Sequence, residues 1–129
     1  MIEDIGGITS KLVSLALDVA SQRQQVIANN IANAQTANFA PQRVRFETLL
    51  DDVLTHSVQP NDEEPMAERL GRIRERLQAG ELIEASGDNE VKLDLEMARL
   101  AENVLRYRAL LEGMSKRGSV IKLAITEGK

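Results

Sequence analysis

The residues able to do chemistry are few in this sequence, and none forms a recognised catalytic pattern. His56 is the single histidine, so no second histidine can complete a metal site or a catalytic pair. Acidic pairs such as Asp51-Asp52 could act in glycoside hydrolysis, but aromatic residues to line a sugar cleft make up only 2% of the chain. The sequence therefore predicts no enzyme and no cofactor or metal site, and it predicts that His56 lies in an exposed loop.

Side-chain amides crowd into residues 28–40, ANNIANAQTANFA. Asn29, Asn30 and Asn33 are three or four residues apart, so they share one side of a helix. An amide beside an apolar contact line can hydrogen-bond across helices; such amides weaken a coiled coil but fix its register. We expect this cluster to be a specific packing joint. The alternative is that these are helix-terminal residues, with Asn33 and Asn38 acting as caps.

The same segment contains the end of a helix. Thr36-Ala37-Asn38-Phe39 is expected to be the exit turn, because Asn is the residue that, after Gly, best tolerates the left-handed backbone conformation. Phe39 can then fold back onto the helix.

Two long helices must position these residues. The first is expected to begin after Gly6-Gly7, with Thr9 or Ser10 as its cap, and to run roughly 40 Å. Its apolar residues alternate at spacings of four and three, which is the heptad pattern of a coiled coil, with one polar break at Gln24. This seam consists of Val13, Leu17, Ala20, Gln24, Ile27, Ile31 and Ala34, and Leu12, Ala16, Val19 and Val26 widen it on one flank.

The last third of the chain continues the same alternation over roughly 50 Å. Its seam consists of Leu93, Met97, Leu100, Val104, Tyr107, Leu111, Met114, Gly118, Ile121 and Ile125. Charged residues, among them Glu96, Glu102 and Arg106, fall between the seam positions. Because long apolar stripes need partners, we expect an assembly interface made of Val13, Leu17, Ala20, Ile27, Ile31, Leu93, Met97, Leu100, Val104, Tyr107, Leu111, Met114 and Ile121.

The middle of the chain is less regular. VRFETLLDDVL (44–54) is predicted to be extended and then helical. Residues 58–65, in which two prolines bracket an acidic patch, are predicted to be a loop. MAERLGRIRERLQ is predicted to be a short helix with Met66, Leu70, Ile73 and Leu77 on one face. In ELIEASGDNEVKL, the turn Ser86-Gly87-Asp88-Asn89 is predicted to join two extended pieces as a β-hairpin. This turn lacks the ligand spacing of a calcium loop.

The prediction for the fold is therefore mainly α-helical. Residues 1–40 form an N-terminal helix with its exit turn, 41–90 an irregular middle segment, and 91–129 a C-terminal helix, all in one structural unit whose ends pack together. The net charge of −4 gives no electrostatic support for nucleic-acid binding, and no apolar run reaches the length of a membrane span. The N-terminus carries acids where a secretory signal has a basic region, so no cleaved signal is expected.

Two segments carry a resemblance to a known family. Residues 20–50 (ASQRQQVIANNIANAQTANFAPQRVRFETLL) and 87–125 (GDNEVKLDLEMARLAENVLRYRALLEGMSKRGSVIKLAI) resemble the N-terminal signature and the C-terminal block of bacterial flagellar basal-body rod proteins, especially proximal rod subunits. The matching motif positions are Asn30, Asn33, Thr36, Asn38 and Phe39. Asn38 stands where the family has Gly and Ala37 where it has Pro, and the family's D-G-N is permuted at 87–89.

The resemblance implies a structural role. Family members are axial subunits whose terminal helices form a coiled-coil tube, and they leave the cell through the flagellar type III export apparatus without a cleaved signal, to assemble as the periplasmic rod. Their partners are copies of themselves, other rod proteins, and the adaptor at the membrane ring and export gate. No nucleic acid or small-molecule substrate is implied. An alternative from the residues alone is a cytoplasmic helical adaptor or export chaperone that folds as its own bundle.

Overall fold

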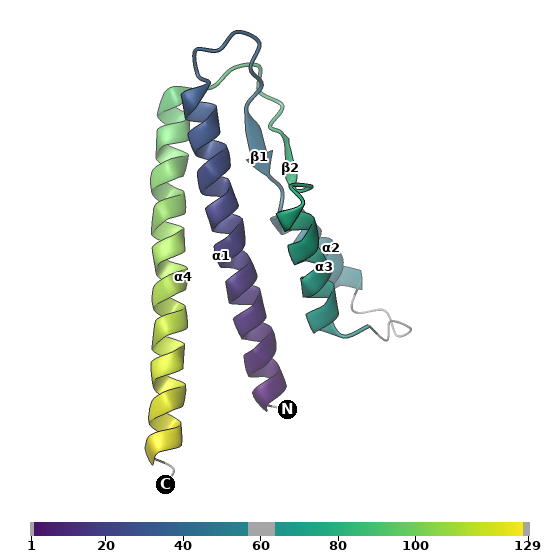
Figure 1. Ribbon diagram of the computed structural model, residues 1–129, viewed down its shortest axis with the longest axis vertical. Helices are drawn as coiled ribbons and strands as arrows, with labels where there is room; N and C mark the ends of the chain where they lie inside the picture. The colour runs from purple at the N-terminus through teal and green to yellow at the C-terminus, as the bar shows by residue number, and fades with distance from the viewer. Residues whose placement is uncertain (1, 57–63, 128–129) are drawn as a thin grey trace.

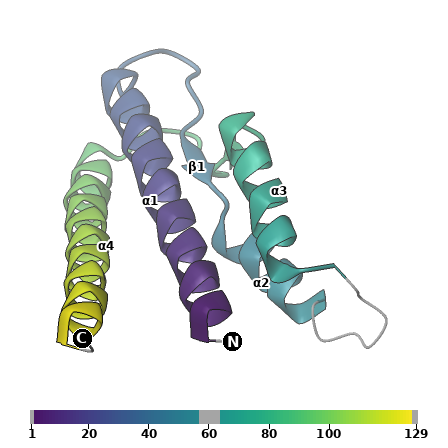
Figure 2. The same cartoon turned by 60° about the horizontal axis from the view of Figure 1, so that its bottom comes forward.

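The computed structural model describes residues 2–56 and 64–127, with side chains for 6–53, 55 and 64–116. Two long helices, α1 (Ile2–Ala32) and α4 (Leu93–Glu127), run antiparallel side by side, with both chain ends at the same end of the molecule (Figure 1). Between them in the sequence come β1 (Gln42–Val44), α2 (Glu47–His56), α3 (Met66–Gln78) and β2 (Ile83–Ala85). These elements lie across α1 from α4 (Figure 2), so α1 is the central helix. The mainly helical fold with long terminal helices is confirmed.

Helix α1 is longer at its start than predicted. It begins at Ile2 and continues through Gly6 and Gly7, so the prediction of a start at Thr9 or Ser10 was wrong. Each helical glycine costs only about 1 kcal/mol relative to alanine, and apolar residues recur every three positions before Leu12. The 31 residues of α1 span about 46 Å.

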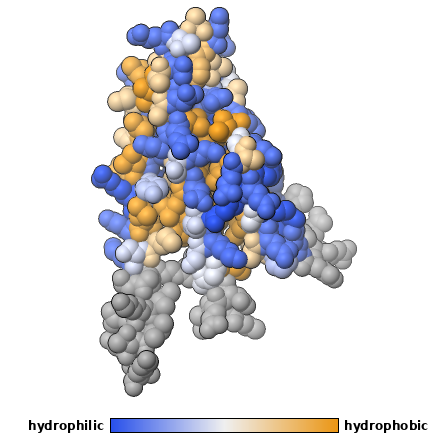
Figure 3. Space-filling view, in the orientation of Figure 1, coloured by the Kyte–Doolittle hydropathy of each residue, from blue (hydrophilic) through white to orange (hydrophobic). Residues whose placement is uncertain are grey.

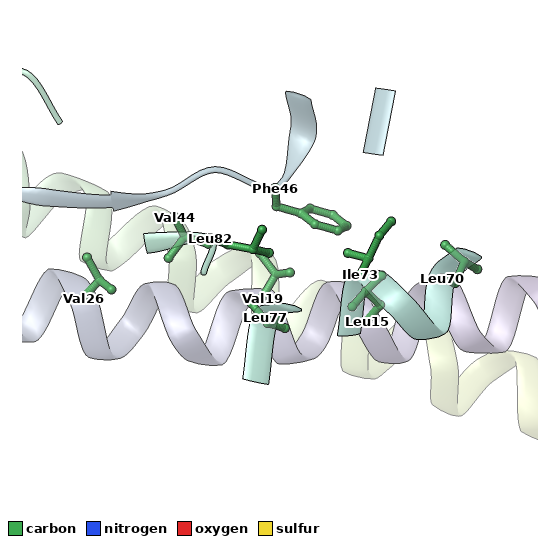
Figure 4. Close-up of a cluster of buried hydrophobic side chains, with 9 residues drawn as sticks. All are labelled: Leu15, Val19, Val26, Val44, Phe46, Leu70, Ile73, Leu77 and Leu82. Atoms are coloured by element: carbon green, nitrogen blue, oxygen red, sulfur yellow. The ribbon is translucent and has the colours of Figure 1, made fainter. Parts of the chain in front are cut away.

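The hydrophobic core lies between α1 and the middle elements. Helix α1 contributes one stripe, and helix α3 faces it with the residues that its 3–4 spacing predicted (Figure 4). The buried cluster consists of Leu15, Val19 and Val26 from α1, Leu70, Ile73 and Leu77 from α3, and Val44, Phe46 and Leu82 from in and around the strands. Each such side chain contributes about 1.5–3 kcal/mol when fully buried. The flank of the predicted α1 seam, with Leu15 added, is therefore the core face.

The two strands pair differently from the prediction. Strand β2 pairs antiparallel with β1, in the register Gln42↔Ala85, Arg43↔Glu84 and Val44↔Ile83. The predicted hairpin was wrong, because the turn at Gly87, which has a φ of 91°, leads into α4 and not into a second strand. The extended-then-helical prediction for 44–54 is confirmed by β1 and α2. His56 is the last residue of α2, so its predicted loop position was wrong, and residues 58–63 of the predicted loop lie outside the described residues.

Two backbone turns with positive φ set the path of the chain. Asn38 has a φ of 62°, as predicted, and the amide of Phe39 bonds the carbonyl of Thr36 at 3.3 Å. A positive φ at the third residue alone is the pattern of a type II turn. At the end of α3, Gly80 has a φ of 76°, and the amides of Glu81 and Gly80 bond the carbonyls of Arg76 and Leu77. This is a Schellman motif, and it directs the chain into Leu82 and β2.

Candidate assembly site

Asn30 joins the end of α1 to the start of β1. Its side chain is fully buried at 0% exposure. Asn30 Nδ2 donates to the carbonyl of Gln42 at 3.0 Å, and Asn30 Oδ1 accepts from the amide of Gln42 at 3.0 Å. The amide therefore occupies the outer edge of β1 in the way that a neighbouring strand would, and it satisfies both backbone groups of one residue.

The same amide reaches α4 through a buried carboxylate. Asn30 Nδ2 lies 3.3 Å from Glu96 Oε2, and Glu96 is 1% exposed. Glu96 Oε1 accepts from Arg43 on β1 and, at 2.9 Å, from Arg99 on α4. A buried charge is tolerated only when it is paired and hydrogen-bonded, and Glu96 meets both conditions. This joint of Asn30, Gln42, Arg43, Glu96 and Arg99 ties α1, β1 and α4 together at one end of the helix pair.

A second polar contact lies two turns along α4. Asn103, seven residues after Glu96, donates from Nδ2 to the carbonyl of Ala20 at 2.8 Å and to Gln24 Oε1 at 3.0 Å. Gln24 is the polar break that interrupts the predicted α1 seam. Asn103 is buried, and its Oδ1 has no hydrogen-bond partner within the described part of the chain. Two polar layers at heptad spacing define one register for α4 on α1.

The other amides act locally at the helix end. Asn33 Nδ2 donates to the carbonyl of Asn29 at 2.9 Å, and Thr36 Oγ1 donates to Asn33 Oδ1 at 3.2 Å. The first bond adds to the backbone bond from the Asn33 amide to the same carbonyl, and the second connects the helix to its exit turn. Of the predicted amides, then, Asn30 is the one that bonds across elements, while Asn33 and Asn38 shape the helix end.

The predicted α1 seam faces α4. Ala20 and Ile27 are buried, and Val13, Leu17 and Ile31 are half-buried. The contact of Asn103 with Ala20 and Gln24 places α4 directly over this stripe.

Helix α4 keeps much of its own seam in solvent. All of the large apolar side chains that are exposed in the described part of the chain belong to α4: Leu93, Leu95, Met97, Leu105, Tyr107, Leu111 and Met114. Apolar patches follow α4 down the left side of Figure 3. Leu100 and Val104 are half-buried, while Gly118, Ile121 and Ile125 lie beyond the described side chains. Helix α4 packs chiefly on a single neighbour, α1, and this leaves most of its circumference open.

The described side chains were compared with the requirements of a metal site and of a membrane span. Among the described residues, His, Cys, Asp and Glu side chains nowhere gather in a group of three that could hold a metal ion. No described helix combines the length and the apolar character that crossing a membrane requires.

Comparison with known proteins decides the family. The profile of the family described as "Flagella basal body rod protein" matches residues 15–39, which include Asn30 and Asn38. The flagellar basal body rod protein FlgB of Bacillus subtilis is 33% identical over 88% of this chain and 90% of its own length. FlgB of Borrelia hermsii is 33% identical over 70% of this chain and 76% of its own length.

The chain belongs to the flagellar basal body rod protein family. It is a structural subunit of the rod, not an enzyme, and the alternative of a free cytoplasmic adaptor or chaperone is set aside. The family profile covers the helix end and exit turn but stops before Gln42, Glu96 and Asn103. The joint around Asn30 therefore connects the family's signature segment to parts of the rod subunit outside it.

Sequence reasoning missed three residues of these polar layers. Glu96 was placed among the charged residues between seam positions, but it is buried; Arg43 and Asn103 were not singled out. One signal was present: Glu96 and Asn103 are seven residues apart, as two layers of one heptad seam would be. In this rod subunit the line on α4 that faces α1 is therefore partly polar, and the apolar line lies beside it.

Proposed function

We propose that the rod subunit assembles through one face of α4. This face, called the α4 outer face, consists of Leu93, Met97, Val104 and Leu111. At about 100° per residue these four lie within roughly 40° of one another on α4, beside the line that meets α1. Leu93, Met97 and Leu111 are 43–52% exposed. A monomeric protein rarely leaves a continuous apolar stripe in water, and such a stripe marks a protein–protein interface. This exposure is the observation that carries the proposal.

The α1 seam completes the proposed interface. Val13, Leu17 and Ile31 are only half-buried beneath α4. A pocket lined by Ala20, Gln24, Val104 and Tyr107 opens between α1 and α4, and one more helix could pack there against both helices. Partner helices from copies of this chain and from other rod proteins would bury these residues. We also propose contacts with the adaptor at the membrane ring and export gate, and passage through the export apparatus without cleavage, as the family resemblance implies.

Leu111→Asp tests the α4 outer face. Leu111 is 43% exposed, so the change removes little from the isolated fold but puts a charge where an apolar partner is expected. We expect cells that carry only this variant to make the protein at normal levels, to lose rods from isolated basal bodies and to be non-motile. The matched control is Lys116→Asp, which introduces the same aspartate at an exposed position about 140° away on the same helix, outside the proposed interface. Motile cells with Leu111→Asp would contradict the proposal.

A further inference from the structure

A groove lined by arginines runs between α1, β1 and α4. Its apolar floor is Val26, Ile27 and Val44, and its volume is about 210 Å³. Four guanidinium groups line it from three elements: Arg23 on α1, Arg43 on β1, and Arg99 and Arg106 on α4. We call this the arginine groove. On α4, Arg99 and Arg106 lie about 160° from Met97 and Val104, so the groove and the α4 outer face are on opposite sides of the helix.

The carboxylates around the arginine groove do not match its arginines in number. Arg43 and Arg99 share the single carboxylate of Glu96. Arg23 pairs with Glu47, and Arg106 pairs with Glu102 at 3.1 Å. Among the residues that the structure describes, four cationic groups therefore meet three anionic ones, in a chain whose net charge is −4.

Partial burial strengthens the electrostatic interactions of these arginines. Three of the arginines, Arg23, Arg43 and Arg99, have only 19–33% of their side chains exposed. Charge interactions are several times stronger in such a setting than in bulk water. Glu47, the partner of Arg23, responds to these charges. Burial raises the pKa of its carboxyl, but the hydrogen bonds from Arg23 and from the Glu47 backbone, together with the charges of Arg23 and Arg106, hold that pKa below its usual value.

We propose that the arginine groove receives an acidic side chain from a neighbouring rod subunit. A guanidinium binds a carboxylate through two parallel hydrogen bonds, and the apolar floor suits the methylene groups of an Asp or Glu side chain. This inference rests on the proposed function, since it presumes a neighbour. The arginine groove gives the subunit a second interaction surface, which is charged, whereas the α4 outer face is apolar. Subunits that repeat head to tail need two different surfaces of this kind.

Charge reversal at Arg106 tests the groove. Arg106 is half exposed and pairs with the exposed Glu102, so Arg106→Glu is expected to leave the isolated subunit folded. We expect it to reduce the number of rods per cell on the order of tenfold, because the incoming carboxylate then meets a like charge. The matched control is Lys116→Glu, which makes the same charge change on an exposed face of α4 outside both surfaces. Equal effects of the two variants would overturn the proposal.

A photo-cross-linker at position 102 identifies the occupant. Glu102 lines the groove with its side chain 69% exposed. In isolated basal bodies we expect the probe to attach to a rod-subunit segment that contains Asp or Glu. Changing that acid to Lys should then restore rods in the Arg106→Glu background. Attachment to a segment without an acid, no attachment, or no restoration would each overturn the inference.

The two proposals fail in different ways. If Leu111→Asp cells keep their rods, the α4 outer face is wrong whatever position 102 captures. If Leu111→Asp removes the rods while Arg106→Glu matches its control, the arginine groove alone is wrong.

Discussion

At the scale of single residues, Asn30 and Glu96 form the joint between helices that the sequence analysis expected from a whole cluster of amides. The amide pattern predicted a register-fixing joint, and one of its members, Asn30, crosses to β1 and α4. Its partner Glu96 was not predicted, because a Glu between heptad positions is usually solvated. Only the fold brings Arg43, which is 53 residues earlier in the chain, to that carboxylate.

Glu96→Gln is predicted to destabilise the isolated subunit by about 3 kcal/mol, because it leaves two arginines without their buried counter-charge. Urea unfolding followed by circular dichroism measures the change. Glu102→Gln is the matched control, since it removes the same charge from an exposed i,i+4 pair, where about 0.5 kcal/mol is expected. Similar losses for both variants would show that the Glu96 joint does not hold the helices together.

At the scale of elements, hydrophobic spacing predicted the helices and missed the strand pairing. The 3–4 spacing in 66–78 identified the inner face of α3, and the left-handed Asn38 followed from its residue type. The hairpin was wrong because three-residue strands carry little register information, and β1 and β2 are brought together by α1 and α3, which no local pattern reveals. In the same way, the α1 seam was found, but which stripe would meet the core and which would meet α4 depended on tertiary packing.

Replacing the buried amide of Asn103 is predicted to raise the stability of the subunit, whereas replacing Glu96 lowers it. Asn103→Leu is predicted to stabilise the isolated subunit by about 1 kcal/mol, because it replaces a buried amide whose Oδ1 has no partner in the described structure with an apolar side chain of similar size. The check is the urea midpoint, which should rise with an unchanged slope. Asn103→Asp is the control: it keeps the size but places a carboxylate against the carbonyl of Ala20, so the midpoint should fall. A lower midpoint for Asn103→Leu would mean that the amide is a net stabilising contact.

At the scale of the whole molecule, stability and assembly depend on different parts of the structure. The buried apolar cluster joins α1 to the middle elements, whereas α4 packs on α1 with two buried polar layers in its first half and leaves many of its large apolar residues exposed. A subunit built in this way can fold first around α1 and leave α4 to be completed by neighbours. The family's role as a polymer subunit explains why the sequence carries more apolar stripe than one chain can bury.

This division predicts how the isolated subunit opens. Amide hydrogen exchange on dilute protein should be slowest in α1 from Leu15 to Ile27 and in α3, where buried side chains surround the backbone. Exchange in α4 should become faster after Asn103, with opening free energies lower by about 2 kcal/mol or more, because beyond that residue no described α4 side chain is buried. In isolated basal bodies the same amides should become protected, since neighbouring subunits would cover the α4 outer face. Uniform protection along α4 in the dilute subunit would contradict this, because it would mean that the helix needs no neighbour to be stable.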